Sequence, residues 1–323
     1  MNASTAGTEH AGPFATPGLR VLLLGSTGFV GCRVAASLLA AGGIRLVTMS
    51  RRTLEPPPFP HATTLVGDLR DPGAVANALH GVDVVINAAS YVGRDAALAR
   101  EVNVTGTRNL LAGCRSLGIR RVIQLSTTSV YGSGLHRGIT EDGAGYHPQS
   151  AASAGRAVAE AEVLDFGGTV VRPNLVFGIG DRWVIPGIVR MMRAGRWPGD
   201  GSARLSMIDV GALGRILASL ALSDPLPGRA FHAAASGPTG VTELLAAVER
   251  ELGTPRPRFE AGSEAPEAKA ALKAEGFSPH QVELVTQDHW YSVKALRAAL
   301  PQVDLGPRLP DAGTWRAYRD AGL

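Results

Sequence analysis

The stretch LRVLLLGSTGFVG, residues 19–31, decides the fold of this chain of 323 residues. It is a short apolar run, of the kind that forms a buried parallel strand, followed at once by three glycines spaced three apart. A helix is expected from Gly28 to Ala41, and glycines at such a turn let the backbone approach a pyrophosphate at the helix N-terminus. The stretch predicts a dinucleotide-binding unit, and a sharp turn without a ligand is the alternative.

Further short runs rich in Val, Ile and Leu alternate with longer amphipathic segments. The predicted strands are 19–25, 45–50, 62–68, 82–89, 121–127, 168–173 and 229–235, and further long helices are expected over 96–116 and 150–164. This alternation is typical of α/β proteins in which helices cover both faces of a parallel sheet. We expect a Rossmann-type, doubly wound parallel sheet with a smaller C-terminal substrate-binding region.

The pattern changes after Pro173, where long loops are expected. These loops are 178–187 and 196–206, followed by a stretch rich in Glu, Ala and Pro over 255–275. The predicted organisation is a flexible tail over 1–18, a nucleotide-binding domain over 19–178, and a mainly substrate-binding region over 179–323 in which 205–235 returns to the first domain.

Composition and charge narrow the function classes. Apolar residues make up 45% of the chain, and 32 Lys and Arg against 28 Asp and Glu give a formal net charge of +4. The sequence has no dense basic run, no leader-like start and no apolar run of membrane-spanning length, so we expect a cytoplasmic protein with neither a nucleic-acid nor a membrane partner. Cys32 and Cys114 lie in predicted helices without metal-ligand spacing, so neither a disulfide nor a metal site is expected.

The end of the second strand indicates which dinucleotide binds. About 20 residues past the glycines, where an acidic residue would bond the ribose hydroxyls, the chain has Ser50, Arg51 and Arg52. An arginine there accommodates a 2′-phosphate through its planar fork. We therefore predict NADPH or NADP+, with two solvated arginines as the alternative.

The third strand ends in GDLRD, residues 67–71. Asp68, next to Leu69, can accept a hydrogen bond from the adenine amino group. It could equally cap the helix that starts near Asp71.

Six motifs together carry a family resemblance. They are GSTGFVG (25–31), GDLRD (67–71), NAAS (87–90), NVTGTRNLL (103–111), LSTTSVYG (125–132) and RPNLVFG (172–178). In this order and spacing the chain resembles the extended short-chain dehydrogenases/reductases from about Leu19 to the C-terminus. The motifs and the resemblance place the cofactor against Gly25, Thr27, Gly28, Phe29, Val30, Gly31, Ser50, Arg51, Arg52, Asp68, Leu69, Ala88, Ala89, Ser90, Thr127, Pro173 and Asn174.

The resemblance breaks at the catalytic pair. Where the family has a tyrosine and, four residues later, a lysine, this chain has Ala152 and Arg156, with Glu160 at its expected place. The resemblance implies that Thr127, four residues before the tyrosine of the VYG motif, orients a substrate carbonyl. Alanine donates no proton and a guanidinium stays protonated, so neither replaces the tyrosine as an acid. Arg156 could still bond the nicotinamide ribose and hold positive charge near an oxyanion.

Other proton donors are open to the chain. Tyr146, Tyr91 and Tyr131 lie near the site in the sequence, although each has an ordinary structural role available, and His136 and His147 are expected in loops. The residues expected to contact the substrate are Tyr91, Thr128, Ser129 and Tyr146. Water, or a phenol beside the substrate carbonyl, would make an enzyme tyrosine dispensable.

These observations predict an NADPH-dependent ketoreductase that reduces a carbonyl of a polycyclic aromatic polyketide, similar to an angucyclinone, in antibiotic biosynthesis. A neighbouring substrate phenol would supply the proton. One alternative is a catalytically inactive NADP(H)-binding sensor or regulator. Another is a dehydratase or cyclase of the same family with non-redox chemistry. The oligomeric state is left open.

Overall fold

A parallel sheet of seven strands forms the centre of the computed structural model, which describes residues 18–260 and 266–323. The strands run in the order β12-β7-β5-β4-β1-β2-β3. Their bounds are β1 (Leu19–Leu24), β2 (Ile44–Ser50), β3 (Thr63–Val66), β4 (Val84–Asn87), β5 (Arg121–Leu125), β7 (Thr169–Pro173) and β12 (Arg229–Ala233). All seven predicted strands are confirmed, with boundaries shifted by up to two residues.

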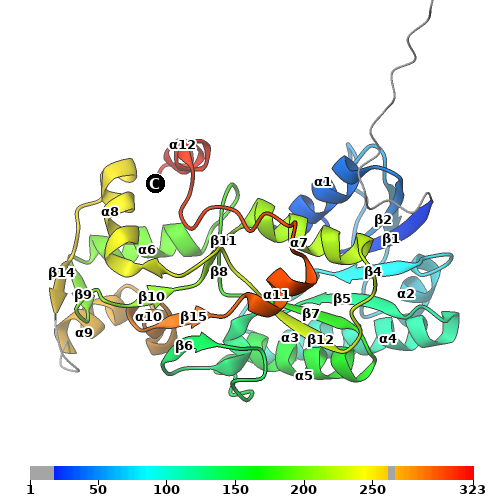
Figure 1. Ribbon diagram of the computed structural model, residues 1–323, viewed down its shortest axis with the longest axis horizontal. Coiled ribbons are helices and arrows are strands. Elements are labelled where there is room, and N and C mark those ends of the chain that lie inside the picture. The colour runs from blue at the N-terminus through cyan, green and yellow to red at the C-terminus, as the bar shows by residue number, and fades with distance from the viewer. Residues whose placement is uncertain (1–17, 261–265) are drawn as a thin grey trace, which may run out of the picture.

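Helices cover both faces of this sheet (Figure 1). One face carries α1 (Gly31–Ala41) and α7 (Val210–Leu222), and the other carries α2 (Pro72–Ala78), α4 (Gly106–Leu117) and α5 (Ala151–Asp165). Successive residues of β1 point into two separate cores, since Val21 and Leu23 pack with α1 and α7 whereas Leu22 and Leu24 pack on the opposite face. The doubly wound fold is therefore confirmed, and it explains why this strand is apolar throughout.

The helix predicted over 96–116 is not regular. It consists of α3 (Ala96–Ala99), a π-helix η1 (Arg100–Thr105) and α4. The π-helix lies against α5 at Gly155, where a Cβ atom would come within 3.2 Å of the Asn103 Cβ atom. A wider turn of this kind re-aims a side chain, and π-turns are frequent at functional sites.

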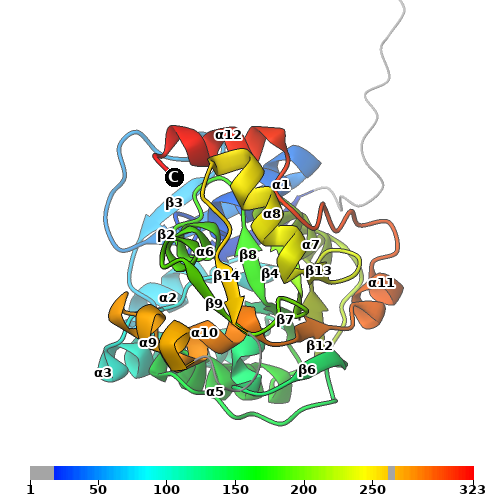
Figure 2. The same cartoon turned by 90° about the vertical axis from the view of Figure 1, so that its left-hand side faces the viewer.

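Most elements beyond β7 form a second region, seen at the left of Figure 1 and facing the viewer in Figure 2. Its helices are α6 (Val184–Arg193), α8 (Val241–Leu252), α9 (Pro266–Ala274), α10 (Pro279–Thr286) and α12 (Ala312–Asp320), whereas α7, β12 and α11 (Lys294–Ala299) pack with the central sheet. Its short strands are β8 (Leu175–Phe177), β9 (Arg196–Pro198), β10 (Arg204–Leu205), β11 (Met207–Asp209), β13 (Thr239–Gly240), β14 (Arg258–Glu260) and β15 (His289–Tyr291). The strand β6 (His136–Ile139) pairs with β15.

The two segments expected as loops, and the stretch rich in Glu, Ala and Pro that follows them, are therefore partly regular. The helix α6 begins inside 178–187 because the Asp181 side chain accepts three N–H groups of its first turn, at 2.7–2.9 Å. Pro186 does not interrupt this helix, because a proline in the first helical turn lacks an N–H group that would have no partner within the helix. Likewise 196–206 holds β9 and β10, and 255–275 holds β14 and α9.

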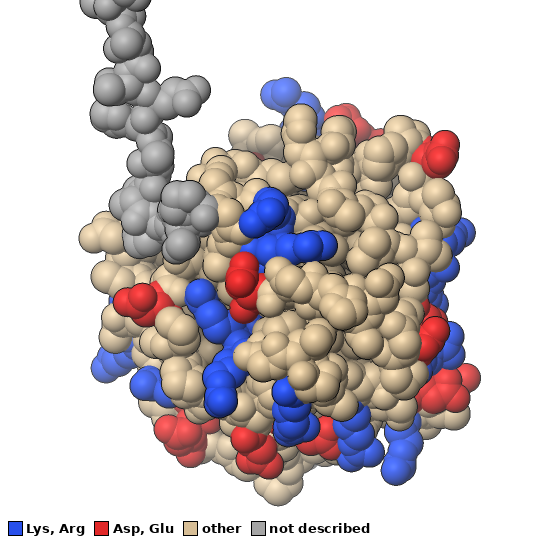
Figure 3. All heavy atoms as spheres, turned by 90° about the vertical axis from the view of Figure 1, so that its right-hand side faces the viewer, with Lys and Arg blue, Asp and Glu red and all other residues tan. Residues whose placement is uncertain are grey.

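The surface carries mixed charge. On the face seen in Figure 3, acidic and basic side chains are interspersed. Among the described residues, no helix has the length and apolar character needed to span a membrane. The tail predicted over 1–18 falls almost wholly outside the described residues.

Candidate cofactor and active site

The glycine loop joins β1 to α1 at the carboxyl edge of the sheet. Gly25 has a φ of +77°, and a Cβ atom there would lie 2.6 Å from the Ala89 nitrogen. A Cβ atom on Gly31 would collide with the Gly25 carbonyl oxygen, to which the Gly28 N–H donates at 3.0 Å. In the described structure no side chain caps the N-terminus of α1, and the N–H groups of Cys32 and Arg33 donate to the Gly28 and Val30 carbonyl oxygens at 3.0 Å. The positive end of the helix dipole is therefore left without an acidic side chain beside it, as an anion-binding turn requires.

The loop lies at the point where the strand order reverses. The strand β1 is flanked by β2 on one side and β4 on the other, and the crevice outside their carboxyl ends is where dinucleotides bind in such sheets. Thr27 and Gly28 are exposed there, whereas Phe29 and Val30 are half-buried.

The arginines expected beside a 2′-phosphate follow the end of β2. Arg51 and Arg52 are exposed, and neither takes part in an ion pair among residues 18–260 and 266–323. The Ser50 hydroxyl donates to the Arg52 carbonyl at 2.7 Å and so holds the turn. Arg51 lies close enough to Asp68 to help lower the pKa of that carboxyl group.

Asp68 is held by a neighbouring arginine. Its carboxylate accepts from the Arg70 backbone N–H at 2.9 Å and from the Arg70 guanidinium at 2.8 and 3.1 Å, which is the main reason its pKa lies below the usual value. The predicted helix cap is wrong, because Asp71 caps α2 through the Gly73 N–H at 2.8 Å. Leu69 is buried against Gly106, and the adenine contact of Asp68 stays a prediction.

Asn103 of the π-helix holds the segment after β4 in place. Its side-chain oxygen accepts from the Tyr91 N–H at 2.8 Å and from the Ser90 hydroxyl at 3.0 Å, and its side-chain nitrogen donates to the Tyr91 backbone carbonyl at 3.0 Å. Ala88 and Ala89 lie against Gly25 through their backbone atoms. Asn103 therefore positions the segment.

Arg156 reaches this segment from α5. Its Nε donates to the Ser90 hydroxyl at 2.9 Å, so two expected site residues that are 66 positions apart are in contact. The helix begins with a capping box formed by Ser150 and Ser153. Ala152 and Arg156 are both half-buried and, being four residues apart, lie on the same face of α5.

Thr127 begins a short 3₁₀-helix η2 (Thr128–Tyr131) at the end of β5. The Thr127 hydroxyl oxygen accepts from the Ser129 N–H at 3.2 Å and donates to the Ser129 hydroxyl at 3.2 Å. Thr128 donates to the Asn174 side-chain oxygen at 2.9 Å. Thr127 therefore lies at the same edge as the glycine loop, with its hydroxyl in a local turn.

Asn174 joins the two regions of the protein. Its amide nitrogen donates at 3.1 Å to the backbone carbonyls of Ser206 and of His289. Together with the bond from Thr128, these contacts engage both ends of its side chain. Pro173 before it is buried at the end of β7, and the cofactor contacts of both residues stay predictions.

The tyrosines considered as proton donors have protein partners. Tyr131 is buried, and its phenol oxygen accepts from Arg172 at 2.6 Å. The Tyr146 hydroxyl donates to the Glu160 carboxylate at 2.6 Å, and burial is the main cause that raises its pKa to about 12. The Tyr91 phenol oxygen accepts weakly from the Asp95 N–H at 3.4 Å.

The expected loop position of His136 is wrong. It lies buried in β6, where Nδ1 is 2.7 Å from the Tyr291 hydroxyl, because β15 from the C-terminal part of the chain pairs with β6. His147 is exposed.

A buried charge network under α5 was missed by sequence reasoning. The Arg172 side chain is 4% exposed and that of Glu160 is fully buried, and they form an ion pair. Glu160 stands where the family resemblance expects it, but no local signal indicates that its partner is an arginine in β7.

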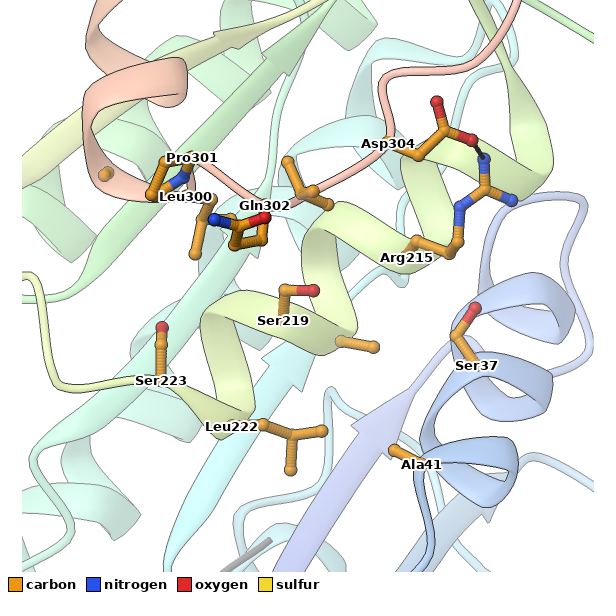
Figure 4. A pocket seen from close by; sticks show the side chains of 13 residues that line it. Ser37, Ala41, Arg215, Ser219, Leu222, Ser223, Leu300, Pro301, Gln302 and Asp304 are labelled. Atoms are coloured by element: carbon orange, nitrogen blue, oxygen red, sulfur yellow. Dashed lines mark hydrogen bonds and ion pairs between the residues drawn. The ribbon is translucent and has the colours of Figure 1, made fainter. Parts of the chain in front are cut away.

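A separate cavity lies on the sheet face covered by α1 and α7 (Figure 4). Its volume is about 560 Å³, and it is bounded by α1, α7 and the segment after α11. The surface of its lining is mainly apolar, and its polar residues include an Arg215–Asp304 ion pair at 2.9 Å. None of the expected site residues lines it.

Comparisons with known proteins agree with this geometry. A 2-alkyl-3-oxoalkanoate reductase of Stenotrophomonas maltophilia (strain K279a) is 28% identical over 318 residues, which cover 89% of this chain and 96% of the relative. A 4-hydroxy-2-methyl-3-oxo-4-farnesyl-3,4-dihydroquinoline-1-oxide ketoreductase of Stigmatella aurantiaca is 27% identical over 190 residues, covering 55% of this chain and 57% of that protein.

Solved structures share the fold. The UDP-glucose 4-epimerase of Thermus thermophilus, in complex with NAD, superposes with a TM-score of 0.71 at 20% identity, over 94% of this chain and 100% of that one. A short-chain dehydrogenase/reductase superfamily protein of Agrobacterium tumefaciens with bound NAD gives a TM-score of 0.72 at 18% identity, over 94% and 98% of the two chains. The model of the NAD dependent epimerase/dehydratase family matches residues 21–227, well over half of the chain. The protein therefore belongs to this family of extended short-chain dehydrogenases/reductases.

Proposed function

We propose that this protein is an NADPH-dependent ketoreductase that works without an active-site tyrosine. The observation that carries the proposal is the meeting of the glycine loop, Ser90 and Arg156 at the carboxyl edge of the sheet, with Ala152 one helical turn before Arg156. The reductase relatives support an oxidoreductase, while the family also includes epimerases and dehydratases.

The residues present fit a nicotinamide dinucleotide. The cradle at Gly25 and Gly31 is one that a Cβ atom would fill, and the uncapped start of α1 suits a pyrophosphate. Arg51 and Arg52, exposed and without an acidic partner among the described residues, favour a cofactor with a 2′-phosphate over NAD(H). When bound, NADPH would supply a hydride to the substrate carbonyl carbon.

The substrate that we propose is a polycyclic aromatic polyketide ketone. Because its Tyr and Lys are replaced on an extended scaffold, the chain resembles in type the atypical ketoreductase of simocyclinone biosynthesis, which acts on an angucyclinone. The Stigmatella relative, named for a ketone on a fused dihydroquinoline ring, supports a fused-ring substrate in part. In this proposal residues 19–178 bind the cofactor, residues 179–323 mainly enclose the substrate, and the enzyme acts in the cytoplasm.

The substrate would also supply the proton. As hydride reaches the carbonyl carbon, the electron pair of the carbonyl double bond moves to oxygen, which needs a proton. The Tyr146 hydroxyl donates to Glu160, and the Tyr131 hydroxyl, which accepts from Arg172, lies 2.7 Å from His232 Nε2. Both phenol protons therefore have partners within the protein. A phenol beside the ketone acts with the high effective concentration of an intramolecular group.

The test is NADPH oxidation, followed by absorbance, with an angucyclinone that carries a hydroxyl beside its ketone and with the methyl ether of that hydroxyl. Binding of the ether to the enzyme–NADP+ complex is measured as the control. Oxidation with the free phenol alone supports a substrate-derived proton. Oxidation with both compounds contradicts that source and points to water or Tyr91. Tight NADPH binding without oxidation of any such ketone would contradict the reductase and favour the sensor.

A further inference from the structure

The Arg156 side chain is a cation without an acidic partner. Its Nε is bonded to the Ser90 hydroxyl, but neither Nη nitrogen has a hydrogen bond to a described residue. Neither Nη is among the buried polar atoms that lack a partner, so both retain contact with open space. Burial lowers the pKa of this guanidinium to about 10, and no carboxylate of the described chain offsets the effect.

Other arginines of the protein differ from Arg156 in this respect. Arg70, Arg108 and Arg172 each form an ion pair with a carboxylate that raises the arginine pKa. A desolvated cation without such a partner is costly to the fold. Its cost is offset when an anion binds, and such unpaired groups are therefore candidates for ligand contacts.

The neighbours of Arg156 keep the guanidinium in one place and leave room beside it. Ser90 is itself held by Asn103, so Nε has a fixed partner and the two Nη groups remain as a pair of parallel donors. Ala152, four residues earlier on the same face of α5, is half-buried and carries only a methyl group. A ligand oxygen can therefore approach the Nη groups.

We propose that Arg156 binds an anionic oxygen of the substrate, either a carboxylate or an ionised hydroxyl on a conjugated ring, and thereby selects acidic substrates. This proposal rests on the proposed function, since it deepens the account of the same site. A neutral ribose hydroxyl of the cofactor would leave the positive charge uncompensated, whereas an anionic oxygen on the two Nη donors neutralises it. The anionic oxygen bound to Arg156 is a different group from the phenol that supplies the proton, because an ionised hydroxyl has no proton to give.

The experiment measures binding to the full-length protein saturated with NADP+, by isothermal titration calorimetry. Two pairs of probes separate the two sources of negative charge. The first is naphthoic acid with its methyl ester, and the second is lawsone, a hydroxynaphthoquinone ionised at neutral pH, with its methyl ether. The variants are Arg156→Gln, which removes the charge, and Arg156→Lys, which keeps it. Arg319→Gln on α12 is the matched control, because it removes a charge from an exposed arginine paired with Glu251.

At least one anion should bind the wild type and Arg319→Gln about 10- to 100-fold more tightly than its neutral partner. Arg156→Gln should lose this preference, and Arg156→Lys should keep part of it. NADPH affinity of Arg156→Gln, measured by fluorescence, should stay within about twofold of wild type.

Three results would overturn the proposal. One is a wild type that binds neither anion more tightly than its neutral partner, which decides the matter even if Arg156→Gln does not fold. The second is an anion preference that survives in Arg156→Gln. The third is a loss of NADPH affinity as large as the loss of anion affinity, which would assign Arg156 to the cofactor. Because no turnover is measured, failure of NADPH oxidation tests the reductase separately from these results.

Discussion

Replacing Arg172 by methionine should destabilise the protein strongly while leaving its volume nearly unchanged. The guanidinium donates to the Glu160 carboxylate through Nε at 2.8 Å, to the Tyr131 and Tyr146 phenol oxygens at 2.6 and 3.1 Å, and to the Glu141 carbonyl at 3.0 Å. Methionine removes all of these donors. Glu160, which is 0% exposed, would remain as a carboxylate without a positive partner.

The magnitude follows from burial. Removing one partner of a buried ion pair costs about 3–5 kcal/mol, because the remaining charge is neither solvated nor paired. The free energy of unfolding of a typical protein is about 5–15 kcal/mol, so this loss is a large part of it. The matched control is Arg108→Met. Arg108 pairs with Glu162, which lies on α5 as Glu160 does, but the Arg108 side chain is 54% exposed. An exposed pair contributes about 0–1 kcal/mol.

The assay is urea unfolding followed by tryptophan fluorescence. Arg172→Met should lower the free energy of unfolding by several kcal/mol more than Arg108→Met. Replacing both partners, as Arg172→Met with Glu160→Leu, should recover much of the loss because no buried charge then remains. An Arg172→Met variant no less stable than Arg108→Met would refute the reasoning, since it would mean that the Glu160 charge is compensated elsewhere.

Three further results are expected. Arg51→Ala should weaken NADPH binding about 10-fold or more and NADH binding little, because only NADPH carries the 2′-phosphate. Fluorescence titration measures both affinities, and equal losses would contradict the assignment of Arg51 to the 2′-phosphate. Ala152→Tyr should change kcat by less than about tenfold in the NADPH-oxidation assay, and a rise of about 10²-fold or more would contradict the substrate-derived proton. Burial lowers the pKa of His232 to about 3 and of His289 to about 4. In the unfolded chain these histidines take up protons below about pH 6.5, whereas in the folded protein they stay neutral. The free energy of unfolding should therefore fall between pH 6.5 and pH 4, by up to about 1.4 kcal/mol per pH unit for each histidine. Urea midpoints that do not change with pH in this window would contradict the prediction.

Much of the central fold follows from local sequence. Each parallel strand is buried on both faces and must be apolar throughout, so its position can be predicted from a few consecutive residues. The glycine loop is equally local, since Gly25 and Gly31 are required by atoms of the same turn and of the adjacent strand end. The segments after Pro173 were harder, because a helix such as α6 starts on a side-chain cap and contains Pro186 in its first turn.

The sequence by itself determined the doubly wound sheet, the dinucleotide cradle and the absence of a tyrosine and a lysine at 152 and 156, because periodicity, glycine spacing and residue identity are properties of short segments. Only the tertiary structure decided which distant groups meet. The packing of α5 against the π-helix brings Arg156 to Ser90, and the packing of α5 on β7 brings Glu160 to Arg172. Such contacts depend on the order of strands in the sheet and on the angle at which a helix lies across it, and neither is written in any local stretch of residues.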